Sequence, residues 1–374
     1  MLSRTINSRR NTSGFSIVDI MVGMVIGLIG IIVIMQVFSV FEAQKRSTTG
    51  SGDAQNGGAI ALYSIQRDIQ QAGYGISSLN MIGCDVQLPT GVTLPSLAPV
   101  TINHASIPAG DTNTDTLLVV YGSSDNPTEG NVVGTQVGSN YPVQAYTSFS
   151  AGPPADLVIA ETLTRPSPCS GANKLILTPV TSSATTGVTV TSSITGMTGG
   201  ALYNLGPTPI VRAYAVRNGN LTQCNYTVND CSIAGNTANT AIWTPIANNI
   251  VSLRAQYGRD TIAGTMTGMV DTYDQTTPTT NCQWVRTSAI RIVLVARNDQ
   301  PNNIPVTQNE PIWAGTTANS PTGFTSSALP IVLTTTTVPS NFTWQSYRYK
   351  IFETTSPIPN IQLLVSPSGG PSGC

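Results

Sequence analysis

The chain has 374 residues, a formal net charge of −1 and 9% charged residues, where a typical soluble domain has about 25%. Its basic residues are scattered, so nothing indicates an electrostatic nucleic-acid surface. The composition favours an uncharged, β-rich extracytoplasmic protein over a cytosolic enzyme.

The N-terminus predicts a membrane span. Residues 1–14 contain three arginines and no acid, and the run from Ile20 to Phe41 carries no charge. At ~1.5 Å per residue these 22 residues reach about 33 Å, enough for a hydrocarbon core of ~30 Å. We expect a transmembrane helix over about 18–41, with its basic end in the cytoplasm. A secretory signal has a shorter apolar region and an A-x-A-like cleavage site, which is absent here. A plain uncleaved signal anchor stays open.

Asp19 lies at the start of this apolar segment, four residues after Phe15. An ionisable residue inside a membrane is costly and is by default a candidate functional residue.

The stretch GFSIVDIMVGMVIGLIG resembles the class III leader and helix start of type IV pilins. The resemblance implies removal of a leader, residues 1–14, by cleavage between Gly14 and Phe15, with N-methylation of Phe15. The family has Glu where this chain has Asp19, so Asp19 is the implied assembly carboxylate. The hypothesis is that Asp19 pairs with the N-terminal amine of a neighbouring subunit, and a position among lipid headgroups is the alternative.

Residues 55–76, QNGGAIALYSIQRDIQQAGYGI, predict an amphipathic helix. Leu62, Ile65, Ile69 and Ala72 recur at helical spacing, while Asp68 and its polar neighbours are expected on other faces. The stretch resembles the second half of the N-terminal helix in PilW-type minor pilins, so residues 15–76 are expected to form that helix. Gly73 and Gly75 are suitable stops. Four glycines within 50–58 predict a melted or kinked joint between the two halves.

Residues 77–207 are expected to form a β- and loop-rich variable region. Strands are predicted at 116–122, 156–164 and 174–180, and a loop or weak hairpin at 181–200. The region is a candidate binding surface, although no motif in it names a ligand.

Residues 208–374 are expected to form a C-terminal β-sheet region. Asn218-Gly219 between two β-type runs predicts a two-residue hairpin. Further strands are predicted at 249–260, 287–298 and 345–355. The order AYAVRNGNLTQ, VSLRAQYGRD, VDTYD, AIRIVLVAR and YRYKIFETT resembles the PilW pattern.

The six cysteines contain no Cys-x-x-Cys pair, which favours disulfides in an oxidising compartment over zinc. Cys224 and Cys231 are seven apart in a polar loop and are expected to bridge. The other four allow three pairings, of which chain order favours Cys84–Cys169 with Cys282–Cys374.

No catalytic set, phosphate-binding loop or cofactor motif is identifiable, so neither an enzyme nor a cofactor is expected. His104 is expected to be a solvated loop residue. Asp260, Asp271 and Asp274 lie in a loop that in PilW-like proteins is often acidic; they are a weak metal candidate, because dense D-x-D-x-D spacing is missing. The four tryptophans are expected to pack in the core or on sheets.

The expected fold is α+β and type IV pilin-like: a long N-terminal helix, membrane-spanning in its first half, packed on a mainly antiparallel β-sheet domain with β- and loop-rich insertions. The resemblance implies a minor pilin that helps to prime the type IV pilus within a tip complex, and that caps or enters the filament. Implied partners are other minor pilins, the major pilin, the prepilin peptidase, the inner-membrane assembly platform and a large tip adhesin. The location would be the inner membrane and then the pilus. A type II secretion pseudopilin and a filament-presented adhesin are the alternatives.

Overall fold

A computed structural model describes residues 14, 16–126, 128–264, 266–319 and 324–362. The chain divides into two compact units, residues 1–50 and 51–374. Helix α1 spans Ile17–Gln71 and contributes to both. The other helical elements are the short α2 (Asn281–Val285) and α3 (Pro359–Gln362), and the 3-10 turns η1 (Tyr146–Ser148), η2 (Gly171–Asn173), η3 (Ala234–Asn236) and η4 (Trp344–Ser346).

The first unit contributes the apolar part of α1. Nearly every large apolar side chain from Ile17 to Phe41 is exposed. The run contains no proline that would interrupt a helix. A helix satisfies its backbone hydrogen bonds within the segment, as an apolar environment requires.

The second unit contains three sheets that are mainly antiparallel. The first sheet has the order β2-β1-β8-β7-β10-β5, with β9 joining β8 to β6. Its strands are β1 (Val86–Gln87), β2 (Thr93–Leu94), β5 (Asn131–Val132), β6 (Asn140–Tyr141), β7 (Leu157–Glu161), β8 (Leu175–Ala184), β9 (Gly187–Val190) and β10 (Ala201–Gly206). The segment expected to be a loop or weak hairpin is the β8–β9 hairpin.

The second sheet has the order β13-β12-β11-β4-β3. Its strands are β3 (Val100–Ile102), β4 (Leu117–Tyr121), β11 (Ile210–Arg217), β12 (Asn220–Asn225) and β13 (Thr244–Ala247). The β11–β12 turn is Asn218-Gly219, with positive φ at both residues, as the two-residue hairpin demands. Strands β3 and β4 precede residue 207 and belong to the same sheet as β11, β12 and β13, which follow it. The boundary expected at residue 207 stays a prediction.

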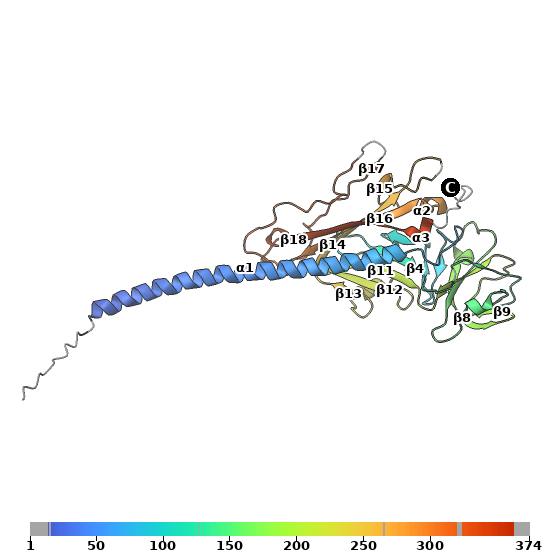
Figure 1. Ribbon diagram of the computed structural model, residues 1–374, viewed down its shortest axis with the longest axis horizontal. Coiled ribbons are helices and arrows are strands. Elements are labelled where there is room, and N and C mark those ends of the chain that lie inside the picture. The colour runs from blue at the N-terminus through green and yellow to red at the C-terminus, as the bar shows by residue number, and fades with distance from the viewer. Residues whose placement is uncertain (1–13, 15, 127, 265, 320–323, 363–374) are drawn as a thin grey trace, which may run out of the picture. The chain divides into compact units, whose positions relative to one another are not determined.

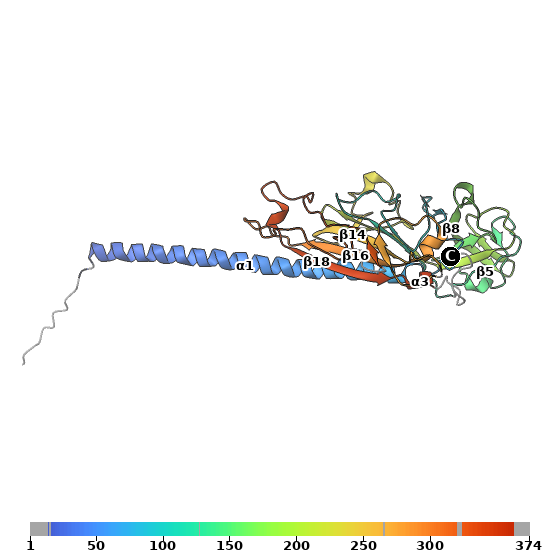
Figure 2. The ribbon, with the colours of Figure 1, turned by 90° about the horizontal axis from the view of Figure 1, so that it is seen from above.

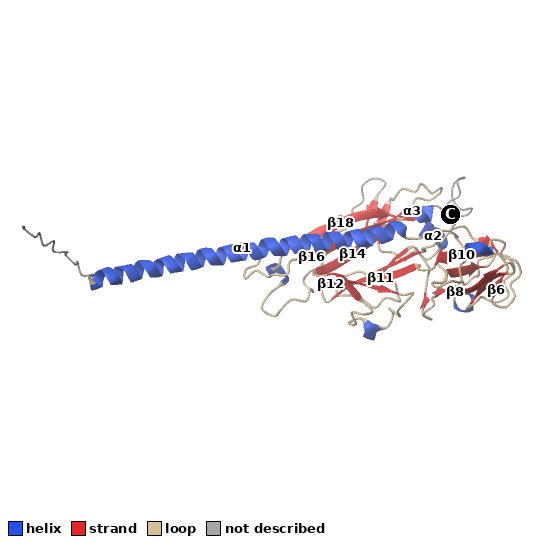
Figure 3. Ribbon diagram, turned by 60° about the horizontal axis from the view of Figure 1, so that its bottom comes forward, coloured by secondary structure: helices blue, strands red, loops and turns tan. Residues whose placement is uncertain are grey.

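The third sheet has the order β17-β15-β14-β16-β18. Its strands are β14 (Ile250–Arg259), β15 (Thr272–Asp274), β16 (Thr287–Arg297), β17 (Thr325–Ser326) and β18 (Tyr349–Pro357). The second half of α1 lies along the second and third sheets (Figures 1 and 3). This half of the helix and these two sheets pack in one apolar core. The expected α+β fold, an apolar N-terminal helix followed by a mainly antiparallel sheet domain, is confirmed.

Strands β14 and β16 of the third sheet are buried on both faces, because the segment between β16 and β18 covers the side away from this core. Val293 and Val295 of β16 face that side and pack with Trp313 and Ile331 of the covering segment. Nearly the whole of β16 is therefore buried, and its residues 292–296 form a continuous apolar run, as expected of a strand buried on two sides.

The melted joint expected between the two halves of α1 is wrong, because residues 48–58 are helical. Gly58 has a packing role instead. A Cβ atom there would overlap the ring of Phe352 on β18, and Figure 2 shows β18 alongside the second half of α1. Close approach of helix and strand, rather than helix breaking, accounts for this glycine.

Candidate functional site: the N-terminal helix and its attachment to the sheets

The apolar part of α1 meets the length and hydropathy requirements of a membrane span. The candidate span is Ile17–Glu42, with a mean hydropathy of 2.8 and no buried residue in its most apolar window. Such a surface is unfavourable in water at ~25 cal/mol per Å². These properties fit anchoring in a membrane, as expected from the sequence.

Asp19 lies in the first turn of α1 and its side chain is exposed. Its backbone N–H donates to the carbonyl oxygen of Ser16 at 3.0 Å. A carboxylate at this end of a helix interacts favourably with the helix dipole. Gly14 is described, whereas Phe15 lies outside the described residues, so the expected cleavage and methylation at this bond remain proposals.

The second half of α1 is attached through a narrow apolar stripe. Ala61, Ile65, Ile69 and Ala72 are each at most 1% exposed, and Leu62 packs at the edge of the same core. The expected amphipathic helix is therefore present.

Asp68 is on the buried face, and the expectation that it occupies a polar face is wrong. Its carboxylate accepts hydrogen bonds from the hydroxyls of Tyr121, at 3.1 Å, and Tyr214, at 2.7 Å. The guanidinium of Arg212 lies 2.7 Å away. Three donors from β4 and β11 thus offset the cost of burying the charge.

These tyrosines remain donors over the physiological pH range. Burial, reinforced by the charge of Asp68, raises the pKa of Tyr121 to about 12. The same causes raise the pKa of Tyr214. Asp68 therefore fixes α1 on the second sheet in one register, since a displaced helix would leave a buried carboxylate without donors.

The end of α1 is capped from two distant segments. The side-chain amide of Asn360 in α3 donates to the carbonyl oxygens of Gln71 and Ala72, both at 3.1 Å. Gly73 has a φ of 84°, and its N–H donates to Val120 in β4 at 2.9 Å. The expected glycine stop is thus a left-handed turn that leads the chain onto the second sheet.

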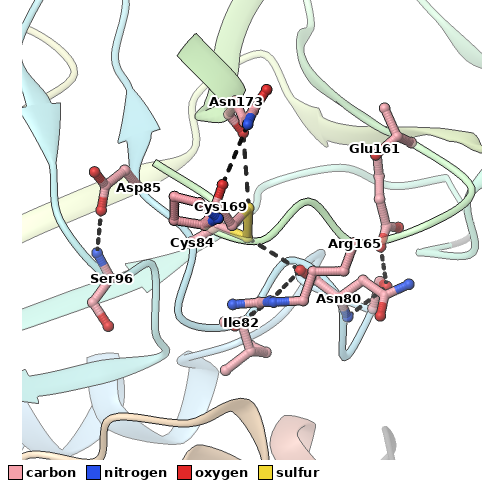
Figure 4. The surroundings of a disulfide bond; sticks show 12 residues. Asn80, Ile82, Cys84, Asp85, Ser96, Glu161, Arg165, Cys169 and Asn173 are labelled. Carbon is pink, nitrogen blue, oxygen red and sulfur yellow. Dashed lines mark hydrogen bonds between the residues drawn. A yellow bond between two sulfur atoms is a disulfide. The ribbon is translucent and has the colours of Figure 1, made fainter. Parts of the chain in front are cut away.

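Two disulfides hold the segments around this attachment. Cys84 is bonded to Cys169, and Cys224 to Cys231, and both are pairs expected from the sequence. Figure 4 shows that Cys84–Cys169 joins the loop after α1 to the loop before β8. The third expected pair includes Cys374, which lies outside the described residues.

The weak metal candidate does not form a cluster. Asp260 accepts from the N–H groups of Thr267, at 2.5 Å, and Gly268, at 3.1 Å. Asp271 accepts from Thr261 N–H at 2.8 Å. Asp274 pairs with an arginine, Arg259. Each carboxylate thus serves its own loop contacts, and among the residues that the structure describes no group of three or more metal-ligating side chains occurs.

His104 is not a solvated loop residue, and that expectation is wrong. It is 5% exposed. Its Nδ1 accepts from Ser106 N–H at 3.1 Å, so Nε2 carries the proton and donates to the carbonyl oxygen of Pro95 at 2.8 Å. Burial lowers the pKa of His104. The neutral ring therefore links Pro95 to Ser106 in the loop before β4 by hydrogen bonds.

The tryptophans pack inside, as expected. Trp243, Trp284 and Trp313 are at most 4% exposed, and the partly buried Trp344 packs at the edge of the core over the third sheet. No pair of exposed tryptophans forms a platform among the described residues.

Helix and sheets together define a class: an α+β protein whose apolar N-terminal helix meets the requirements of a membrane span and is followed by mainly antiparallel sheets. The family model described as Type IV Pilus-assembly protein W, PilW, matches residues 213–360. The suspected resemblance to PilW is thereby confirmed over these residues, which run from β11 to α3.

Among solved structures, a type IV-like pilin from Thermus thermophilus is similar to this chain, with 12% identity and a TM-score of 0.32. The similarity covers 82% of this chain and 96% of that one. A TM-score this low bears on neither fold nor function. No curated protein matches the chain.

Sequence reasoning missed the Asp68 contacts and the Gly58–Phe352 packing. One signal for Asp68 was present: Ile65 and Ala72 lie three and four residues from it and share its face. A carboxylate amid these apolar positions indicates a buried charge that needs partners. No local signal identifies Phe352, which is almost 300 residues from Gly58.

Proposed function

We propose that the chain is a minor pilin that helps to prime type IV pilus assembly within a minor-pilin tip complex, and that caps or enters the filament. The PilW match at residues 213–360 carries this proposal. The apolar helix supports it, because a subunit that leaves the bilayer for a filament needs an apolar helix that can exchange lipid for protein neighbours.

We infer that a dedicated peptidase removes residues 1–14 and that Phe15 becomes the methylated N-terminus. The basic leader would stay in the cytoplasm and the sheets would lie outside the inner membrane. The partners would be other minor pilins, the major pilin, the peptidase, the assembly platform and a large tip adhesin.

The cleavage proposal is tested by Gly14→Val. A side chain at Gly14 would obstruct the approach of the peptidase to the backbone, so the full-length precursor should accumulate in the membrane. Gly23→Val, inside the apolar run, is the matched control. Mature protein beginning at Phe15 in the Gly14→Val strain would contradict the proposed cleavage.

The assembly proposal is tested by deleting the gene and restoring it in trans. Loss of surface pili, with major pilin retained in the membrane, is the expected result. Intact pili with lost adhesion would favour a filament-presented adhesin, and intact pili with lost exoprotein secretion would favour a pseudopilin. Either of these results would overturn the assembly role.

A further inference from the structure

A small polar pocket lies beside the Cys84–Cys169 disulfide. Its volume is about 120 Å³, and it lies between the loop after α1, the end of β7 and the segment before β8. Its polar lining residues are Asn80, Glu161, Thr162, Arg165, Asn173, Lys174 and Thr195. Figure 4 shows four of them, Asn80, Glu161, Arg165 and Asn173, around the disulfide.

The charged walls of the pocket are held in place by the loop after α1. Ser78 Oγ donates to Glu161 Oε1 at 2.7 Å. The Nη1 of Arg165 donates to the carbonyl oxygens of Asn80 and of Ile82, the latter at 2.7 Å. The disulfide joins that loop to the opposite wall. A pocket with such fixed walls loses little conformational entropy on binding.

Glu161 and Arg165 share this pocket without forming an ion pair. Glu161 is 7% exposed. It accepts a hydrogen bond from the hydroxyl of Ser78, and the hydroxyl of Tyr203 also contacts it. Burial lowers the pKa of Arg165, while the charge of Glu161 acts in the opposite direction. The pocket lining therefore contains an acceptor, the Glu161 carboxylate, and donors on Asn173 and Lys174.

The chemistry of the lining restricts the ligand. A simple anion would be repelled by Glu161, and a simple cation by Arg165 and Lys174. An apolar ligand would leave these groups desolvated and unpaired. A hydroxyl group both donates to a carboxylate and accepts from a guanidinium, ammonium or amide. Neighbouring hydroxyls on one ring would meet both walls.

We propose that this pocket binds a single hydroxyl-rich sugar residue, such as the terminal residue of a glycan. Glu161 accepts from ring hydroxyls, and Asn173 and Lys174 bind oxygen atoms on the opposite side. The pocket is made by the variable region, so the proposal does not depend on how the chain takes part in pilus assembly.

The test is saturation-transfer-difference NMR on the full chain in a detergent without a sugar headgroup. The probes are D-glucose, D-galactose, D-mannose and N-acetyl-D-glucosamine, each up to about 20 mM. At ~0.3 kcal/mol per non-hydrogen atom, a hexose should bind with a Kd in the millimolar range. At least one probe is expected to give saturable transfer.

Variants then locate the binding. Glu161→Gln, Asn173→Ala and Lys174→Ala should each weaken binding about tenfold or more, while the exposed Lys350→Ala on β18 should leave it unchanged. Circular dichroism verifies that each variant is folded. The proposal is overturned if no probe binds, or if binding persists equally in the three pocket variants.

Discussion

The guanidinium of Arg212 on β11 lies 2.7 Å from the carboxylate of Asp68 on α1, and Asp68 is 1% exposed. Residues separated by 144 positions thus form one buried ion pair between helix and sheet. Removing one member of such a pair leaves the other charge without compensation.

We therefore expect Asp68→Ala to lower the free energy of unfolding by about 3–5 kcal/mol. The loss leaves Arg212 and two buried tyrosine hydroxyls without their acceptor. Denaturant unfolding of the full chain in detergent measures this change in the free energy of unfolding. Arg67→Ala, at the exposed neighbouring position, should change the value by less than about 0.5 kcal/mol. Equal effects of the two substitutions would contradict the role given to Asp68.

Gly58 and Gly52 make a matched pair in the same helix. Alanine at Gly52 meets no atom within 4 Å and should stabilise the helix by up to ~1 kcal/mol. Alanine at Gly58 would overlap the Phe352 ring, so overpacking should outweigh that gain and give a net loss of about 1–2 kcal/mol. Denaturant unfolding gives the free energy of unfolding of Gly52→Ala and of Gly58→Ala for this comparison.

The double variant identifies the cause. Phe352→Leu shortens the side chain that an alanine at position 58 would meet, so it should recover part of the loss in a Gly58→Ala background. If Gly58→Ala stabilises the protein as much as Gly52→Ala does, the close approach of helix and strand is not what requires glycine.

The sequence predicted features that depend on local patterns. The apolar run, the Asn218-Gly219 hairpin and the strands β4, β14 and β16 follow from composition, turn chemistry and periodicity. It failed where a distant contact overrides a local preference. The glycines near residue 58 predicted a broken helix, because helix propensity contains no term for Phe352. The loop sequence around His104 predicted exposure, because local polarity does not reveal its burial or its hydrogen bond to Pro95.

His104 should make stability depend on pH. Its folded-state pKa is below the value near 6.5 of an unfolded chain, so the folded state resists protonation. The contribution of neutral His104 to the free energy of unfolding is complete above about pH 6.5. It is lost as the pH falls from there towards the folded-state pKa of His104. The added slope is at most ~1.4 kcal/mol per pH unit, for one proton.

The measurement is the free energy of unfolding between pH 7.5 and 4.5, in the native chain and in His104→Gln. The native chain should lose stability more steeply below pH 6.5, because the substituted chain has no imidazole to protonate. Parallel pH profiles would show that protonation of His104 is not linked to unfolding.

Asp19 has the most direct bearing on the proposed function. Cleavage after Gly14 would give Phe15 a positive amine about one helical turn from Asp19. We propose that Asp19 pairs with that amine on a neighbouring subunit. An unpaired carboxylate in a bilayer costs up to ~3 kcal/mol on insertion scales, and opposite charges attract more strongly where water is scarce. The pairing would therefore bias the subunit towards the filament.

Two substitutions separate this pairing from a simple position among lipid headgroups. Asp19→Glu keeps the charge with a longer reach and should preserve incorporation into pili. Asp19→Ala should still be cleaved and retained in the membrane, because the apolar span is intact, but it should lose incorporation and co-purification with other minor pilins. Immunoblots of sheared pili and of membrane fractions measure both. Normal incorporation of Asp19→Ala would reject the pairing while leaving the PilW match untouched, since that match rests on residues 213–360.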